Sequence, residues 1–213
     1  GAGPADLDVT RQGILDGDGF VMPAAGTIVH RHSLDPARPP LDPAANVIEL
    51  RQTPHTFGLG LIERIPEAAI VAGADPDDLD GDGVRGRVHR LPDGRLGSFG
   101  WKGAIPSVRE FVRDAVTMEL GMTMPDEPGL TFGHAADGDA TRDPEVSLDE
   151  VDLLEFFLAN LAGPPRTSTD PALEERGETL FVEAGCATCH VPAFDTADGT
   201  PVPAYSDFLL HDV

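Results

Sequence analysis

One short motif, Cys186-Ala187-Thr188-Cys189-His190, constrains this chain more than any other feature of its sequence. It contains the only two cysteines, so the thiols cannot form a disulfide framework and are left for metal, haem or a redox pair. Two thiols at this spacing can each add to one porphyrin vinyl group, and the adjacent imidazole can then ligate iron. The motif therefore predicts a covalently attached c-type haem, held by Cys186 and Cys189 with His190 on the iron.

Zinc binding and thiol–disulfide exchange are the alternative uses of this motif. A zinc site needs a further cysteine or a histidine pair at short spacing, and the sequence has none beside the motif. A thioredoxin-type pair normally sits where a strand leads into a helix, whereas this motif follows a predicted helix. Haem attachment is the stronger interpretation.

The composition suits a chain that packs around a cofactor. Only 6% of the residues are aromatic, whereas the 24 Gly and 20 Pro favour loops. A buried porphyrin would supply the apolar surface that such a chain lacks. The sequence has no apolar stretch of the ~20 residues that a membrane helix needs, and no signal-peptide pattern at its start. It is a mature product or a fragment, and we expect a fragment.

The formal net charge of −22 bears on the partners of the protein. Nucleic acids and anionic membranes would repel the chain. One interpretation is a docking face for a basic redox protein, such as a small cytochrome or copper protein. The other, which we favour, is general solubility in a saline habitat or a codon bias that prefers Arg to Lys.

Apolar residues at helical spacing predict helices over 59–65, 67–72, 106–120, 147–162 and 170–184. Ser147 and Glu150 form a capping box, and Asp170 precedes Pro171 as an N-cap. Residues 1–50 look irregular, with short strands or hairpins at 27–29 and 47–50. We expect a mainly α fold with long Gly/Pro-rich loops, cytochrome c-like helical domains and minor β structure.

The helix before the motif resembles the N-terminal helix of class I cytochromes c over about twenty residues. Gly177 stands where a glycine permits a close helix crossing, and Phe181 where an aromatic ring packs on the haem edge. The sixth iron ligand stays open, because all 4 methionines precede the motif. The alternatives are His211, an open site, or a ligand beyond Val213, which we favour.

Six further segments occur in a fixed order: GLGLIERIP (58–66), DGDGVRGR (80–87), GSFGWK (97–102), LGMT (120–123), LAGPPR (161–166) and YSDFLLHD (205–212). This series resembles the bacterial di-haem c-type oxidoreductases named as thiol oxidoreductases, which are similar in turn to di-haem cytochrome c peroxidases. The resemblance covers residues from about 25 to 213. It implies that the full-length protein is a peroxidase-like, haem-dependent oxidoreductase, in which the haem at Cys186, Cys189 and His190 passes electrons towards a second haem.

The chain departs from this family in two respects. Relatives have two haem motifs, the first upstream of the matched region, and this chain has one. Relatives also continue after an Asp-Met pair where this chain has Asp212-Val213, which leaves any ligand role there open. We therefore expect residues 1–165 to be the remainder of an N-terminal, peroxidase-like haem domain without its motif. Residues 166–213 would begin a C-terminal cytochrome c domain.

The resemblance implies roles for two further residues. In such families a tryptophan between the two haems relays electrons, and Trp101, the only tryptophan, lies in the matching segment. The alternative is a core tryptophan packed under a Gly-rich turn. Glu119 lies near the position of the distal acid in such families, with His55 and His134 as alternatives. A solvated carboxylate at a helix end is the competing interpretation of Glu119.

Asp78, Asp80 and Asp82 resemble the first half of a calcium loop, with oxygen ligands at alternate positions. Position twelve would be His89 rather than a bidentate Glu, so an EF-hand is not expected. The alternative is an Asp/Gly turn that favours left-handed backbone. A second candidate, Asp137 with Asp139, is weaker.

Three functions follow. The leading hypothesis is a piece of a di-haem oxidoreductase, with haem c as cofactor. The alternative is a complete single-haem electron-carrier cytochrome c with an acidic docking surface, and the third is a haem-free calcium or metal module. Because haem is attached to c-type apoproteins outside the cytoplasm, we expect a periplasmic or other extracytoplasmic location.

Overall fold

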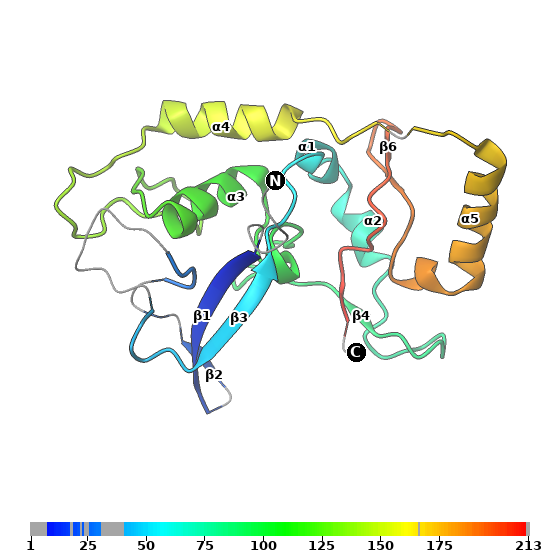
Figure 1. Ribbon diagram of the computed structural model, residues 1–213, viewed down its shortest axis with the longest axis horizontal. Coiled ribbons are helices and arrows are strands. Elements are labelled where there is room, and N and C mark those ends of the chain that lie inside the picture. The colour runs from blue at the N-terminus through cyan, green and yellow to red at the C-terminus, as the bar shows by residue number, and fades with distance from the viewer. Residues whose placement is uncertain are drawn as a thin grey trace. The chain divides into compact units, whose positions relative to one another are not determined.

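A computed structural model describes residues 8–17, 19–21, 23, 26–30, 41–165 and 167–211 (Figure 1). The contacts divide the chain into two compact units. Unit 1 comprises Gly1–His55 and Val112–Asp152, and unit 2 comprises Thr56–Phe111 and Leu153–Val213. Both units are discontinuous in sequence. The predicted haem domains, 1–165 and 166–213, stay a prediction.

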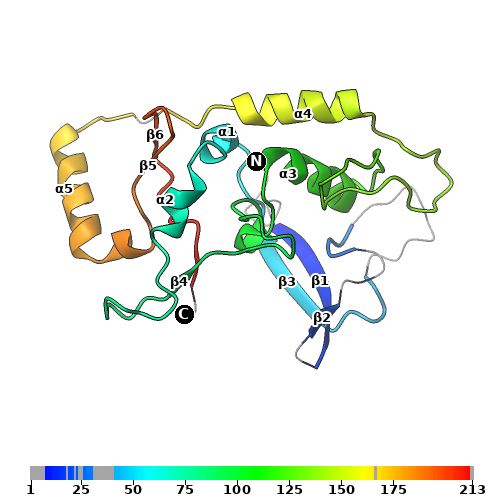
Figure 2. The ribbon, with the colours of Figure 1, turned by 180° about the vertical axis from the view of Figure 1, so that it is seen from behind.

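Unit 1 contains a three-stranded antiparallel sheet in the order β2-β1-β3. Its strands are β1 (Asp8–Asp16), β2 (Gly19–Val21) and β3 (Val47–Gln52). Figure 2 shows β1 and β3 running side by side, in a register that pairs Asp8 with Gln52 and Gly13 with Val47. The Asn46 side chain extends this pairing, because it accepts from the Leu15 amide (2.8 Å) and donates to the Leu15 carbonyl (2.9 Å).

This sheet corrects the predicted fold class. Of the residues that the structure describes, 28% are helical and 16% are in strands, so the expectation of a mainly α fold is wrong. The strand predicted at 47–50 is confirmed as β3, whereas within 27–29 only Ile28 makes an isolated bridge, to Arg11. β1 was missed because its sequence, DVTRQGILD, does not alternate apolar with polar residues, and its partner β3 is distant in sequence.

The predicted helix after Pro106 is confirmed, with an unexpected end. α3 (Val108–Asp114) continues into a π-helical turn, Ala115–Glu119, in which the Leu120 amide donates to the Ala115 carbonyl (3.3 Å). The predicted apolar stripe is buried at Val108, Val112 and Val116. Gly121 then takes a φ of +70°, which ends the helix as expected.

A buried arginine anchors the loop that follows in unit 1. The Arg113 side chain is 1% exposed and pairs with Glu127 (2.7 Å). Its guanidinium also donates to the carbonyls of Phe132 (2.7 Å) and Pro125 (3.0 Å). A buried charge is stable only when its donors are satisfied, so Arg113 fixes the loop over 125–132.

Unit 2 begins with two short helices, α1 (Leu59–Ile62) and α2 (Glu67–Val71), separated as predicted at Pro66. Ile65 and Ile70 are buried against Val202, which lies far along the chain. Val202 belongs to the hairpin of β5 (Phe194–Asp195) and β6 (Pro201–Val202). The core of unit 2 therefore joins its two sequence stretches.

The two long helices begin at the predicted caps. α4 (Leu148–Asn160) has its capping box, in which the Ser147 amide donates to Glu150 (2.8 Å) and the Glu150 amide to the Ser147 hydroxyl (3.3 Å). α5 (Pro171–Glu183) begins after Asp170, whose carboxylate accepts from the Leu173 amide (3.2 Å). No helix among the residues that the structure describes is both long and apolar enough to cross a bilayer.

Gly97 gives a prediction on stability. The loop over 98–105 closes through hydrogen bonds between Phe99 and Ile105, and a Cβ on Gly97 would lie 1.9 Å from the Gly103 carbonyl oxygen. Because the obstacle is backbone, we expect Gly97→Ala to lower the free energy of unfolding by about 1–3 kcal/mol. Urea unfolding measures this loss.

Gly73→Ala is the matched control, because the nearest atom to its added Cβ is 3.6 Å away. We expect a change within about 0.5 kcal/mol. Equal unfolding midpoints for the two variants would contradict the close approach at Gly97.

Candidate haem-binding site

The Cys-x-x-Cys-His motif forms one tight turn directly after α5. Gly185, with a φ of +77°, ends the helix, and a 3-10 turn follows over Cys186–Thr188. The His190 amide donates to the Cys186 carbonyl (2.9 Å), which brings the ends of the motif together. Cys186 is exposed, Cys189 is half-buried, and both thiols are free. Two unpaired thiols on one turn are what thioether attachment requires.

The imidazole of His190 is held by a residue far downstream. Its Nδ1 lies 3.0 Å from the Tyr205 carbonyl oxygen, an acceptor, so Nδ1 carries the proton and donates. The other nitrogen, Nε2, then presents its lone pair to a metal. Histidine ligands are usually oriented in this way, by a hydrogen bond from the second ring nitrogen to a carbonyl or carboxylate.

Two aromatic rings lie beside this imidazole. Phe181, half-buried near the end of α5, lies edge-on to Tyr205 with centroids 5.6 Å apart, and its centroid is 6.5 Å from that of His190. The structure thus places Phe181 beside His190 of the motif. Its packing on a haem edge stays a prediction.

The segment over 205–211 closes over the motif. The Asp207 amide donates to the Cys189 carbonyl (3.1 Å), and the buried Asp207 carboxylate contacts His211 Nε2 (2.7 Å). β7 (Leu210–His211) then pairs with β4 (Gly86–Arg87). A Cβ on Gly86 would lie 2.8 Å from Leu209 Cδ1 and 3.2 Å from His211 Cε1, so this strand passes close to the 209–211 side chains.

These contacts bear on the sixth iron ligand. Of the two His211 nitrogens, Nε2 contacts Asp207, and Nδ1 is buried without a hydrogen-bond partner among the described residues. Ligation by His211 would therefore use Nδ1. Position 213 lies outside the described residues, and the choice among the three predicted alternatives stays open.

The charge around Cys189 disfavours a redox-active pair. Burial raises the pKa of the Cys189 thiol, and the negative charges of Asp207 and Asp82 raise it further. A redox-active cysteine needs its thiolate form, which a raised pKa opposes. Asp78, Asp80 and Asp82 form the only group of three or more possible metal ligands found among the described residues, and it includes neither cysteine.

Comparison with known proteins identifies the family. The profile of the family described as "Di-haem oxidoreductase, putative peroxidase" matches residues 45–213. The chain belongs to this family. No curated protein and no solved structure matches it. The family is one of oxidoreductases and is named for haem. It is the family that the sequence motifs resembled.

Within this member of the family, Trp101 lies in unit 2 with the Cys-x-x-Cys-His motif. It begins a 3-10 turn, Trp101–Gly103, and is half-buried. Lys102, with a φ of +58°, bends this turn, and its carbonyl contacts His89 Nδ1 at 2.7 Å. A half-buried tryptophan fits both an electron relay and core packing, so both roles of Trp101 stay predictions.

Glu119 lies in unit 1, at the last residue of the π-helical turn. Although its side chain reaches the surface, partial burial raises its pKa. Asp114, which the sequence analysis missed, has a pKa raised to about 6 by burial and by the charge of Glu119, against the opposing charge of Arg11. The wide π turn places residues five apart on adjacent turns, so the two carboxylates interact.

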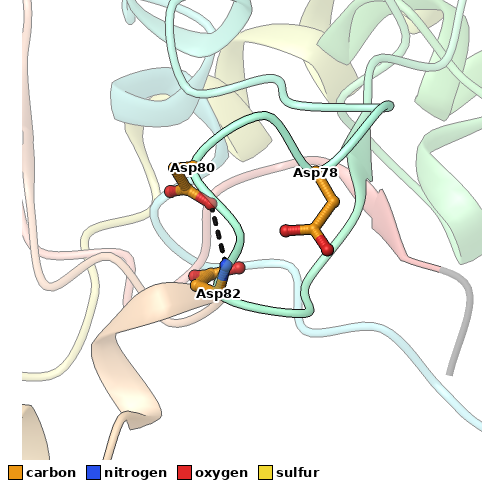
Figure 3. Close-up of side chains that lie close together, drawn as sticks. All are labelled: Asp78, Asp80 and Asp82. Carbon is orange, nitrogen blue, oxygen red and sulfur yellow. Dashed lines mark hydrogen bonds between the residues drawn. The ribbon is translucent and has the colours of Figure 1, made fainter.

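The acidic loop gathers its carboxylates as the sequence suggested. Ligand oxygens of Asp78, Asp80 and Asp82 all lie within 4.8 Å of one another (Figure 3). One oxygen of each also accepts from a loop amide, of Gly83, Asp82 and Val84 respectively, at 2.8–3.2 Å. Asp78 has a φ of +53°. Both the calcium site and the simple turn fit this arrangement, and calcium stays a prediction.

The remaining candidates lie elsewhere. His89 is engaged with Lys102, as described above. Asp137 and Asp139 form a similar turn, in which the Asp139 amide donates to Asp137 (3.0 Å). His55 and His134, the alternatives for the distal acid, are both exposed in unit 1.

Proposed function

We propose that this di-haem oxidoreductase carries a c-type haem attached through Cys186 and Cys189 and ligated by His190. In this proposal the haem is the electron-entry centre, which delivers electrons to a second haem elsewhere in the full-length enzyme. The observation that carries the proposal is the His190 Nδ1 contact with Tyr205, which leaves Nε2 for iron beside two free thiols.

The apolar residues before the motif support this assignment. Leu173 and Leu180, on the predicted packing side of α5, are 66% and 52% exposed. A Cβ on Gly177 would meet nothing within 4 Å among the described residues. Haem, when bound, supplies a one-electron iron couple and a broad apolar plane, and such a plane would cover these side chains.

The protein's own residues would then perform three tasks. Tyr205 and Asp207 hold the motif and its imidazole in place. Trp101 would relay electrons, because indole is among the side chains most easily oxidised. Glu119, whose pKa is raised by partial burial, would pass a proton to the place where an oxidant is reduced.

For peroxide, the oxidant in the family's description, reduction to two waters consumes two electrons and two protons. The reducing partner would supply the electrons through the entry haem, one at a time. The protons would come from solvent, one of them by way of Glu119. Substrate oxidation is the alternative use of the same centre.

A haem count on the full-length gene product tests the proposal. We expect two covalent haems per chain, with a high-spin or peroxide-reactive species and catalytic peroxide reduction by a reduced donor. Two haems without any such species would overturn the peroxidase-like activity. A protein matured in a competent host without covalent haem would overturn the whole proposal.

A single-haem electron carrier is the second candidate, favoured by the single motif and the net charge of −22. It predicts one low-spin, six-coordinate haem per chain and no turnover. The same haem count therefore separates the two candidates.

The location and the partner follow from this chemistry. Because covalent haem attachment takes place outside the cytoplasm, we propose a periplasmic or extracytoplasmic enzyme. Its electron donor would be a small cytochrome or copper protein, and a basic one would associate faster with an acidic surface. A loss of donor turnover rate with rising salt would support that steering.

We also propose that the loop over 78–82 binds calcium. The expected result is a calcium-dependent heat in titration calorimetry that is lost in Asp80→Asn, because three carboxylates supply the oxygen ligands calcium prefers. Asp139→Asn, in the second Asp turn, should leave the heat unchanged. No heat in the wild type would favour the simple turn.

A further inference from the structure

The backbone of Tyr205 adopts a conformation that tyrosine rarely takes. Its φ is +49°, in the left-handed region, and Phe208 in the same segment has a φ of +58°. Asn and Asp can offset the cost of this region with a local hydrogen bond from their short side chains, but Tyr cannot. Such a residue persists only where surrounding contacts hold it, often at functional sites.

The contacts of Tyr205 all involve the haem motif or its flanks. Its carbonyl accepts from His190 Nδ1 (3.0 Å), and its amide donates to the Pro192 carbonyl (3.4 Å). Both backbone groups of one residue therefore bind the chain just after the cysteines. A change of φ at Tyr205 would move the carbonyl away from the imidazole.

Two contacts hold this conformation. The Tyr205 ring lies edge-on to Phe181, with centroids 5.6 Å apart and an interplanar angle of 88°. Two residues later, the Asp207 amide donates to the Cys189 carbonyl (3.1 Å). The first contact joins Tyr205 to α5, and the second joins its segment to the motif itself.

We propose that Tyr205 is a positioning residue for the iron-ligating imidazole, and that its left-handed backbone places the carbonyl which fixes the tautomer and orientation of His190. This inference rests on the proposed ligation by His190. A hydrogen bond from Nδ1 makes Nε2 a more basic ligand, which stabilises ferric over ferrous iron. Tyr205 thus lowers the reduction potential of this haem.

Three variants of the full-length, haem-loaded protein separate backbone from side chain. Tyr205→Val removes the left-handed conformation, because a β-branched residue resists it. Tyr205→Gly accepts this conformation freely, and Tyr205→Phe keeps the ring. We expect redox titration to give a higher midpoint potential for Tyr205→Val and the wild-type potential for the other two.

Haem content is measured first, by the pyridine haemochrome spectrum. If the wild-type protein carries no haem on Cys186 and Cys189, the proposed function itself is overturned. If all variants hold haem and Tyr205→Val keeps the wild-type potential, only the positioning role is overturned. If Tyr205→Val fails to load haem, Tyr205→Gly decides: wild-type loading and potential support the inference, and a second failure overturns it.

Discussion

The double variant Cys186→Ser/Cys189→Ser of this 213-residue chain is expected to retain no covalent haem. A thioether forms only from a thiol and a vinyl group, and these are the only two cysteines in the chain. Each single variant keeps one thiol and should hold a reduced amount of haem through one thioether. Acid-acetone extraction followed by a haem stain on a denaturing gel measures what remains attached.

Thr188→Ser is the matched control for this experiment. It lies in the same 3-10 turn, is exposed, and occupies a variable position of the motif. We expect wild-type haem content. If the double variant kept acid-resistant haem, attachment would use other residues and the candidate site would be wrong.

Replacing Asp114 with Asn is expected to stabilise unit 1 at neutral pH by up to about 3 kcal/mol. The pKa of Asp114 is raised from 3.8 to about 6 in the folded protein, first by burial and then by the charge of Glu119. Below pH 3.8 the carboxyl is protonated in both the folded and the unfolded state, so it costs no stability. As the pH rises from 3.8 through 6, the carboxyl loses its proton in the unfolded state while the folded state still holds it, so the free energy of unfolding falls.

The measurement is the free energy of urea unfolding as a function of pH. The advantage of Asp114→Asn over wild type should grow between about pH 4 and 6 and then stay constant. Asp126→Asn removes an exposed carboxylate of the same unit and should follow the wild-type curve. Parallel curves for wild type and Asp114→Asn would contradict the burial of this carboxyl.

Local signals allowed the helix ends to be predicted from the sequence. Asp170 caps α5 by accepting from an amide only three residues away, and the Ser147–Glu150 box acts over the same distance. Pro66 separates α1 from α2 through its own fixed φ. Such effects depend on few neighbours, so they can be read without the fold.

The missed features depend on distant partners or on backbone geometry. β1 forms because β3 pairs with it, which its own residues do not indicate. In an ordinary helix Asp114 and Glu119 would face different sides, and only the π turn brings their charges together. Tyr205 acts on His190 through a carbonyl, a group that every residue has. No side-chain pattern could have indicated that role.

The discontinuous construction of unit 2 has a consequence for the order of its assembly. The stretch Thr56–Phe111 leaves the ribosome before Leu153–Val213, yet its Ile65 and Ile70 are buried against Val202. Until the later stretch arrives, Ile65 and Ile70 lack Val202 and pack only against neighbours of their own stretch, such as Leu61 and Leu96. The motif at 186–190 belongs to this later stretch, as do Tyr205 and Asp207. The candidate haem site and the missing part of the unit 2 core are therefore made together, at the end of the chain.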